Sequence, residues 1–236
     1  MKKLDRKMTF FVLGCVLFAL VVVGATYAYF TASANDNTTV KGDASTVSFG
    51  LTVTRVTTID MAYGLIPMKN NQAPYAASNK CYDSNNNVGC QLYKITVSAD
   101  SDTVMFLDGY IFMTPRDERL ETRIARVYTD DDENYYTKFT KDDFDRSDFK
   151  ESDYIKTGVR VTDVDSSPKK TEDFDCLVVD NEKIGGDVGR VKNFYVMVWV
   201  YDNGEAQDYL QGMELAYQGV VNFVTAEGNE ISATFD

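Results

Sequence analysis

Apolar and polar side chains alternate along several short stretches of this chain, and that period of two is the feature that most limits its fold. In residues 46–56, TVSFGLTVTRV, the apolar positions are Val47, Phe49, Leu51 and Val53. Residues 91–98, QLYKITVS, follow the same rule. Because successive side chains of a β-strand point to opposite faces, this alternation predicts strands that bury one face.

Further β-rich stretches follow, with turn-forming residues between them. They cover residues 158–164, 176–179, 191–201, 217–225 and 231–235. Residues 103–114, TVMFLDGYIFMT, contain two such runs around Asp108-Gly109, a pattern that predicts a tight hairpin.

One helix is predicted directly after this hairpin. Thr114 can cap it, and Pro115 suits its first turn. Leu120, Ile124 and Val127 would then share one face. Together the pattern predicts an all-β protein, a jelly-roll-like antiparallel β-sandwich with one short helix and a long acidic loop.

An apolar run follows a basic start at the N-terminus. The sequence MKKLDRK precedes residues 8–30, which carry no charge and are numerous enough to span a bilayer as a helix. A cleaved secretory signal and a retained membrane anchor both fit this plan, and both place the rest of the chain outside the cell. Small residues favour cleavage by a signal peptidase either between Ala28 and Tyr29 or between Ala34 and Asn35.

These observations predict three regions. Residues 1–34 are a signal peptide or membrane anchor, residues 35–45 a polar linker or donor segment, and residues 46–236 the β-sandwich domain. Contact with a membrane is predicted only through residues 8–30, and only if they are not cleaved. The expected location is secreted or at the extracellular cell surface.

Two cysteines flank a polar loop in the segment NKCYDSNNNVGCQLY. An oxidising exterior would let Cys81 and Cys90 form a disulfide around this turn. Two cysteines without a histidine do not make a zinc site. Cys176 is then left without a partner in the predicted domain, either buried or available for an intermolecular bridge.

Charge and composition exclude several classes of function. The net charge of −12 argues against nucleic acid as a partner, because a phosphate backbone requires a basic surface. The chain has no histidine, which excludes Ser-His and Cys-His nucleophile pairs. No catalytic residue is predicted, although chemistry by a pair of carboxylates stays open. The expectation is a protein that is not an enzyme and needs no cofactor, with calcium as the one possible ion.

The most unusual segment is the acidic excursion, residues 130–154, with ten acidic and four basic residues. Its aromatic residues recur every five positions, at Phe139, Phe144, Phe149 and Tyr154. This step matches neither a helix face nor a strand face, so the segment is predicted as a surface excursion that some rings attach to the body. Two alternatives are a partner-binding loop and a calcium site, with the candidate ligands Asp130, Asp131, Asp132, Asp142 and Asp143.

The end of the apolar run also resembles a known family. Residues 24–30, GATYAYF, are similar to the leader end of the TasA/camelysin group of Gram-positive exported proteins, whose signal peptides are cut by the peptidase SipW. The resemblance implies a jelly-roll fold, export and, for some members, assembly into biofilm-matrix fibres in which an N-terminal strand completes a neighbour's sheet. Camelysin is described as a metalloprotease, but without histidine this chain has no HExxH motif.

The sequence therefore predicts an exported structural protein of the cell surface or extracellular matrix. Its expected partners are other copies of itself or other matrix subunits, which it would meet in a fibre through its N-terminal segment. The alternative is a membrane-tethered surface binding module that uses the acidic, aromatic loop. The first predicts polymers that sediment, and the second predicts monomers in the membrane fraction.

Overall fold

The strands of this protein form two sheets, which are seen in a computed structural model. The structure describes residues 31–32, 37–44, 47–57, 65–82, 85, 87–115, 119–157, 177–205, 207, 217–226, 228 and 230–235. Within these ranges no helix is long and apolar enough to cross a membrane. The apolar run 8–30 and the predicted strand 158–164 lie outside the described residues.

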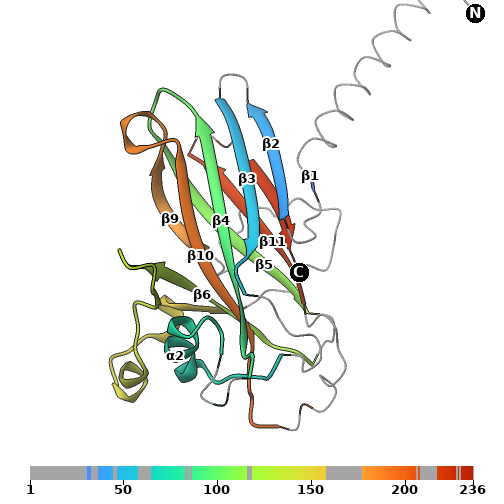
Figure 1. The fold of residues 1–236 in the computed structure, drawn as a ribbon, viewed down its shortest axis with the longest axis vertical. Helices are drawn as coiled ribbons and strands as arrows, with labels where there is room; N and C mark the ends of the chain where they lie inside the picture. The colour runs from blue at the N-terminus through green and yellow to red at the C-terminus, as the bar shows by residue number, and fades with distance from the viewer. Residues whose placement is uncertain are drawn as a thin grey trace, which may run out of the picture.

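The first sheet has five strands (Figure 1). In spatial order they are β1 (Thr31–Ala32), β12 (Glu230–Phe235), β11 (Tyr217–Thr225), β5 (Met105–Pro115) and β9 (Leu177–Ile184). Neighbouring strands are antiparallel, except that β1 runs parallel to β12.

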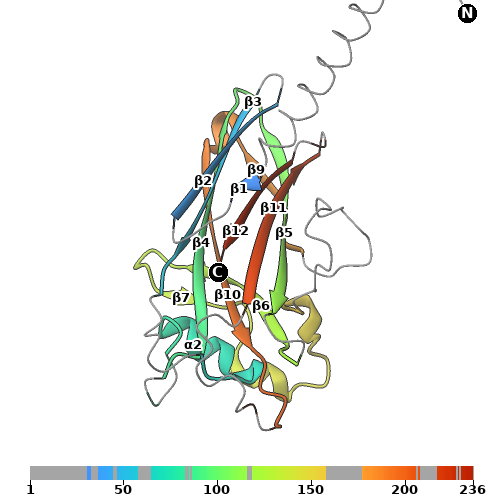
Figure 2. The same cartoon turned by 90° about the vertical axis from the view of Figure 1, so that its right-hand side faces the viewer.

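The second sheet has seven strands, all paired antiparallel. Their order is β2 (Asn37–Ala44), β3 (Val47–Arg55), β4 (Cys90–Asp100), β10 (Val191–Val200), β6 (Thr122–Thr129) and β7 (Tyr135–Tyr136), with β8 (Ile155–Thr157) also paired to β6. Figure 2 shows the two sheets edge-on as two layers.

The inner cluster is the hydrophobic core between the two sheets. From β3 it buries Phe49, Leu51 and Val53, the alternating residues of the predicted strand. Across the gap it contains Val221 and Phe223 of β11, with further apolar residues from β4, β10, β5, β9 and β12. The prediction of a mostly β protein with two antiparallel sheets is confirmed, and burial of the inner face explains the period of two in strands such as β3.

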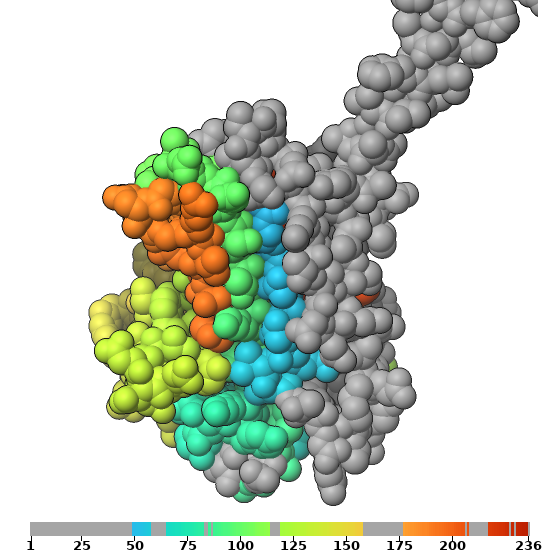
Figure 3. Space-filling view, turned by 45° about the horizontal axis from the view of Figure 1, so that its top comes forward, coloured from blue at the N-terminus to red at the C-terminus, as the bar shows by residue number. Residues whose placement is uncertain are grey.

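The outer cluster lies on the opposite face of the second sheet. Its buried sheet residues are Cys90, Leu92, Ala125, Val127, Ile155, Met197 and Trp199. Short segments cover them: the helix α2 (Ala73–Ser78) with the 3₁₀ turn η1 (Asn70–Gln72), and part of the acidic excursion. Figure 3 shows α2 and the excursion side by side at one end of the molecule. The central strands of this sheet are thus buried on both faces.

The hairpin predicted at Asp108-Gly109 is wrong. β5 continues through both residues, and its pairing with β9 shifts register there. A Cβ on Gly109 would lie 2.7 Å from Cε1 of Phe223 and 2.9 Å from Cβ of Val179, so the glycine permits close approach of the core. Asp108 accepts a hydrogen bond from the backbone N–H of Asn181 at 2.9 Å. The Asp-Gly pair therefore marks a β-bulge instead of a turn.

The helix predicted from Thr114 is also wrong. Thr114 and Pro115 belong to β5, and residues 122–129 form β6. Ile124 faces the inner cluster, whereas Val127 faces the outer one, so both are buried without sharing a helix face. The one α-helix of the described chain is α2, which starts with Ala73-Pro74 and buries three alanines. The remaining helical segments are the 3₁₀ turns η2 (Lys141–Asp145), η3 (Glu151–Asp153) and η4 (Gly186–Val188).

Candidate functional site

The first described residues of the chain lie at one edge of both sheets. β1 pairs with β12, where Thr31 is opposite Ser232 and Ala32 is opposite Ala233. β2 pairs with β3 along its whole length, from Asn37 opposite Thr54 to Ala44 opposite Val47. β2 also contacts both β1 and β12. The N-terminal segment therefore joins the two layers at this edge.

Most of the segment predicted as a linker or donor, residues 35–45, is a strand of the second sheet. Residues 37–44 are the edge strand of the second sheet in their own chain, and each is paired to β3. One side of β2 has no strand neighbour among the described residues. The predicted cleavage residues Ala28, Tyr29, Ala34 and Asn35 lie outside the described part of the chain.

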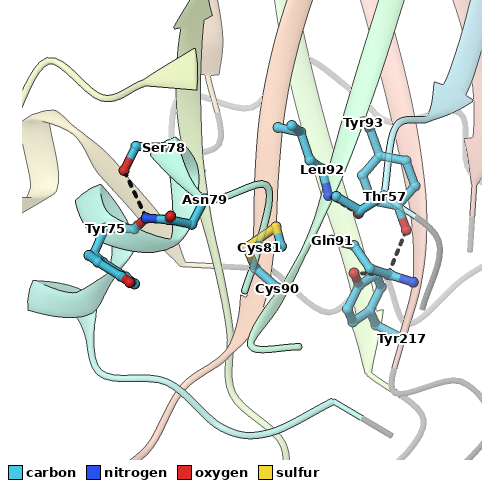
Figure 4. The surroundings of a disulfide bond; sticks show 10 residues. All are labelled: Thr57, Tyr75, Ser78, Asn79, Cys81, Cys90, Gln91, Leu92, Tyr93 and Tyr217. Carbon is cyan, nitrogen blue, oxygen red and sulfur yellow. Dashed lines mark hydrogen bonds between the residues drawn. A yellow bond between two sulfur atoms is a disulfide. The ribbon is translucent and has the colours of Figure 1, made fainter. Parts of the chain in front are cut away.

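The predicted disulfide between Cys81 and Cys90 is present. The two sulfur atoms are bonded at 2.02 Å, and both residues are completely buried in the outer cluster. The bond joins the chain just after α2 to the start of β4 (Figure 4). It therefore fixes the covering helix to the sheet that it covers.

A buried polar group lies on the other side of β4 from the disulfide. Gln91 accepts hydrogen bonds at Oε1 from the hydroxyls of Tyr93 and Tyr217 (Figure 4), the first at 2.7 Å. Burial raises the pKa of Tyr217 well above its usual value, with a further contribution from Tyr93. Tyr217 belongs to β11, so this network links the two sheets inside the core. Its hydroxyl and amide oxygen atoms bond to one another, as buried polar groups that stabilise a fold usually do.

The acidic excursion is attached to the body by its aromatic residues. Phe139 is 2 % exposed and is buried in the outer cluster with residues of the second sheet. Its ring contacts those of Phe144, Phe149 and Tyr154 at centroid distances of 5.9, 6.4 and 5.7 Å. The 3₁₀ turns η2 and η3, with a turn between them from Arg146 to Phe149, return the chain to the same side every five residues. The five-residue period thus results from repeated turns, as the surface-excursion prediction implied.

The aspartates of the excursion hold these turns together. Asp130 accepts hydrogen bonds from the backbone N–H groups of Asp132 and Asn134 and from the Asn134 side chain. Asp143 accepts from the backbone N–H and hydroxyl of Thr140 and forms an ion pair with Arg146 at 3.0 Å. Hydrogen bonds lower the pKa of both carboxyls, mainly from the Asn134 side chain for Asp130 and from the Thr140 backbone for Asp143.

The predicted calcium ligands do not form a common site. Asp130, Asp131 and Asp132 lie in one turn, and Asp142 and Asp143 lie in η2. In the described ranges no group of three or more acidic or cysteine side chains is arranged to hold a metal ion. Asp130 and Asp143 already use their oxygens within their own turns. Calcium binding by these residues stays a prediction that this arrangement does not support.

A pocket of about 260 Å³ opens where the excursion meets the edges of both sheets. Its wall combines three cations, two carboxylates, three aromatic rings and two aliphatic side chains. These are Arg126, Lys138, Lys156, Asp153, Asp180, Tyr128, Phe139, Tyr154, Leu177 and Val178. They come from β6, from the excursion, from β8 and from β9.

Arg126, in the wall of this pocket, joins the two sheets. Its Nη1 donates to the carbonyl oxygen of Val178 at 3.1 Å, and its Nη2 lies 3.6 Å from Oε1 of Glu182. The guanidinium also stacks over the rings of Tyr128 and Phe194. Its buried Nε has no hydrogen-bond partner among the described residues. The Arg126 charge is therefore only partly compensated by the protein.

Of the other two cations, Lys138 belongs to the excursion and Lys156 to β8 directly after it. Lys138 is exposed, and its Nζ lies 4.5 Å from the centre of the Tyr128 ring. No carboxylate of the described chain is within ion-pair distance of it. The Nζ of Lys156 donates to the carbonyl oxygen of Ser152 at 2.7 Å. The three cations outnumber the two carboxylates, so the pocket has a net positive charge although it lies beside a strongly acidic segment.

Sequence reasoning found the excursion but missed most of the pocket. Tyr154 and Phe139 were singled out by their spacing, whereas Arg126, Tyr128 and Asp180 were not. Those three lie on β6 and β9, strands of different sheets that approach only in the folded chain. No local pattern marks them, because each occupies an ordinary strand position.

Comparison with known proteins adds no identification. No family model matches the chain, and no curated protein or solved structure matches it either.

Proposed function

We propose that this chain is an exported structural protein with a jelly-roll β-sandwich, which assembles through its N-terminal segment into fibres of the cell surface or extracellular matrix. The observation that carries the proposal is the position of β1 and β2 at one edge of both sheets. These strands are the first after the apolar leader, and they are peripheral in the sheet order. An edge strand can be replaced by the same strand of a neighbouring copy without altering the core strands.

The two predicted cleavage positions have different consequences for the edge. Cleavage between Ala28 and Tyr29 keeps Thr31 and Ala32, so β1 can stay on β12. Cleavage between Ala34 and Asn35 removes β1 and leaves that side of β12 without its partner strand. An unpaired row of backbone N–H and C=O groups is an acceptor for a strand from another chain. Cleavage at the second position therefore favours assembly more strongly.

An engineered disulfide that holds β2 against β3 of its own chain tests this proposal. Thr39 is directly opposite Thr52 in the antiparallel pair, at a spacing that a disulfide can bridge. In the mature protein, a Thr39→Cys/Thr52→Cys variant with Cys176→Ser would hold β2 in its own sheet when oxidised. We expect sedimentable polymers from the reduced protein and monomers from the oxidised one. Equal polymerisation in both states would contradict assembly by exchange of β2, and the Cys176→Ser protein without the new cysteines is the control.

A second candidate is a surface binding module, tethered to the membrane by an uncleaved leader. The observation that favours it is the pocket beside the acidic excursion, with partly compensated cations next to an exposed aromatic ring. This candidate predicts an intact N-terminus and monomers in the membrane fraction. N-terminal sequencing of the protein recovered outside the cell separates the two, because a start at Tyr29 or Asn35 excludes the tether.

A further inference from the structure

We infer that the pocket between β6, β9 and the acidic excursion binds a single hexuronic acid unit, the carboxylate-bearing sugar of an acidic polysaccharide. This inference rests on the second candidate function and is independent of fibre assembly. A pocket for such a sugar needs a cation for the carboxylate, acceptors for the hydroxyl groups and an apolar face for the ring. The wall of this pocket supplies all three.

The cations in the pocket wall favour a ligand with a negative charge. Lys138 is exposed at the pocket wall, and its only described partner is the face of the Tyr128 ring. A cation held over an aromatic face keeps its N–H donors available to an anion, since the ring takes up none of them fully. Arg126 lines the same pocket, and its Nη2 has Glu182 only at 3.6 Å. A carboxylate entering here would gain a charge-assisted hydrogen bond and would displace no ion pair of Lys138.

The carboxylates and rings select a sugar over a simple anion. Asp153 and Asp180 line the same pocket, and both side chains are exposed to it without a hydrogen-bond donor from the described residues. An inorganic anion would be repelled by them, whereas the hydroxyl groups of a sugar can donate to them. Tyr154 is 38 % exposed and stacks on Phe149 with an angle of 14° between the rings, so one face of the pair is supported from behind. Such a rigid, exposed ring is a platform for the apolar face of a sugar.

The size of the pocket limits the ligand to about one sugar ring. Its volume of about 260 Å³ is below the usual range for drug-sized ligands, which starts at roughly 300 Å³. A ligand of this size binds with an affinity on the order of millimolar unless it is part of a repeated polymer. Many tethered copies on one cell surface would multiply this weak contact along a polysaccharide chain.

The test uses the protein recovered from the outside of cells, titrated with glucuronic acid, glucose and inorganic phosphate and followed by saturation-transfer NMR and calorimetry. Lys138→Gln removes the exposed cation of the pocket. Lys141→Gln is the matched control, because it removes the same charge from the same excursion outside the pocket wall. Both side chains are exposed, so both variants should fold, and their melting temperatures verify this.

We expect glucuronic acid to bind at least about tenfold more tightly than glucose, and Lys138→Gln to weaken it about fivefold or more while Lys141→Gln leaves it unchanged. Equal binding of the two sugars, or equal effects of the two variants, would overturn the inference. If phosphate bound and glucuronic acid did not, the sugar assignment would be overturned. The pocket would then be a site for small anions, and the binding-module candidate would still hold. No binding of any of the three would contradict both the inference and the binding-module candidate.

Discussion

The two faces of the second sheet are buried in different ways. On the inner face, strand residues such as Ile95 and Val196 pack against another sheet. On the outer face, Leu92 and Trp199 are just as buried, but α2, a disulfide and the acidic excursion cover them. The inner cover is a continuous hydrogen-bonded sheet, and the outer cover consists of short segments held by a disulfide, by packed aromatic rings and by the short strands β7 and β8 on β6.

This difference indicates that the outer cover can open without the sheets. A cover built from short turns and strands of two to five residues has a lower local free energy of unfolding than a sheet of long strands. The inner cluster spans strands from both ends of the chain, so it can only be lost when the whole fold is lost. The pocket proposed to bind a sugar lies between the outer cover and the two sheets, whereas the edge proposed for assembly belongs to the sheets alone.

The largest expected effect comes from truncating one phenylalanine in each cluster. Phe223→Ala removes a ring that packs against Phe194 in the inner cluster, and it should lower the global free energy of unfolding by about 3–5 kcal/mol. Phe139→Ala removes the ring that attaches the excursion, and its cost should appear as local opening of residues 130–154. Hydrogen exchange distinguishes them. If Phe139→Ala increased exchange in β11 as much as in the excursion, the two clusters would be one cooperative unit.

The disulfide should have the next largest effect. Replacing Cys81 and Cys90 by alanine frees a loop with a sequence separation of 9, which costs about 3 kcal/mol in the chain-entropy model. We expect the outer cover to open at lower denaturant than the sheets, which Trp199 fluorescence and strand-amide exchange would show separately. Adding a reducing agent to the double variant is the control, and it should change nothing further. If Trp199 fluorescence and strand-amide exchange changed at the same denaturant concentration, the proposal that the outer cover opens before the sheets would be wrong.

A smaller effect is expected from Tyr217→Phe inside the core. Losing the hydrogen bond to Gln91 should cost about 1 kcal/mol. Because burial raises the pKa of Tyr217 above 10.0, the neutral hydroxyl contributes its full stability below that pH, and the contribution is lost as pH rises further. Denaturant titrations between neutral and alkaline pH measure this. The wild-type protein should lose more stability in alkali than the phenylalanine variant, and equal losses would contradict the assignment.

The smallest expected effect is on the turns of the excursion. The pKa of Asp143 is lowered from 3.8, so its contribution is present above that pH and is lost as pH falls through its lower folded value. We expect the amide of Thr140 to lose protection from exchange in acid while the amides of β4 keep theirs. Asp143→Asn should weaken the same protection at neutral pH, and Asp142→Asn, which changes an exposed neighbour, should not. Equal loss in both variants would mean that Asp143 does not hold this turn.

The contrast between the clusters also explains what the sequence could predict. Alternation located β3 and β4 because the inner face imposes a period of two on these strands, and β11 was located as a β-rich stretch. Asp108-Gly109 was misassigned as a turn because its glycine serves the distant Phe223, a contact absent from local sequence. Leu120, Ile124 and Val127 resembled a helix face because β6 is buried on both sides, which hides its alternation.

The candidate sites were predictable to different degrees. The disulfide followed from two cysteines around a polar turn, and the excursion was marked by its charge and its five-residue aromatic spacing. The pocket was not predictable, since Arg126 and Asp180 are 54 positions apart in the sequence numbering and lie in different sheets. Their approach depends on how the sheet edges meet, which is a property of the fold as a whole.

The measurement that tests the central claim most directly is a cross-link between copies. One mature chain carries Thr39→Cys, a second carries Thr52→Cys, and both carry Cys176→Ser; they are mixed, allowed to assemble and then oxidised. Exchange of β2 places Thr39 of one copy opposite Thr52 of the next, as it is within one chain, so disulfide-linked dimers of the two variants should form in the polymer. Polymers that form without this cross-link would contradict assembly through the N-terminal strand.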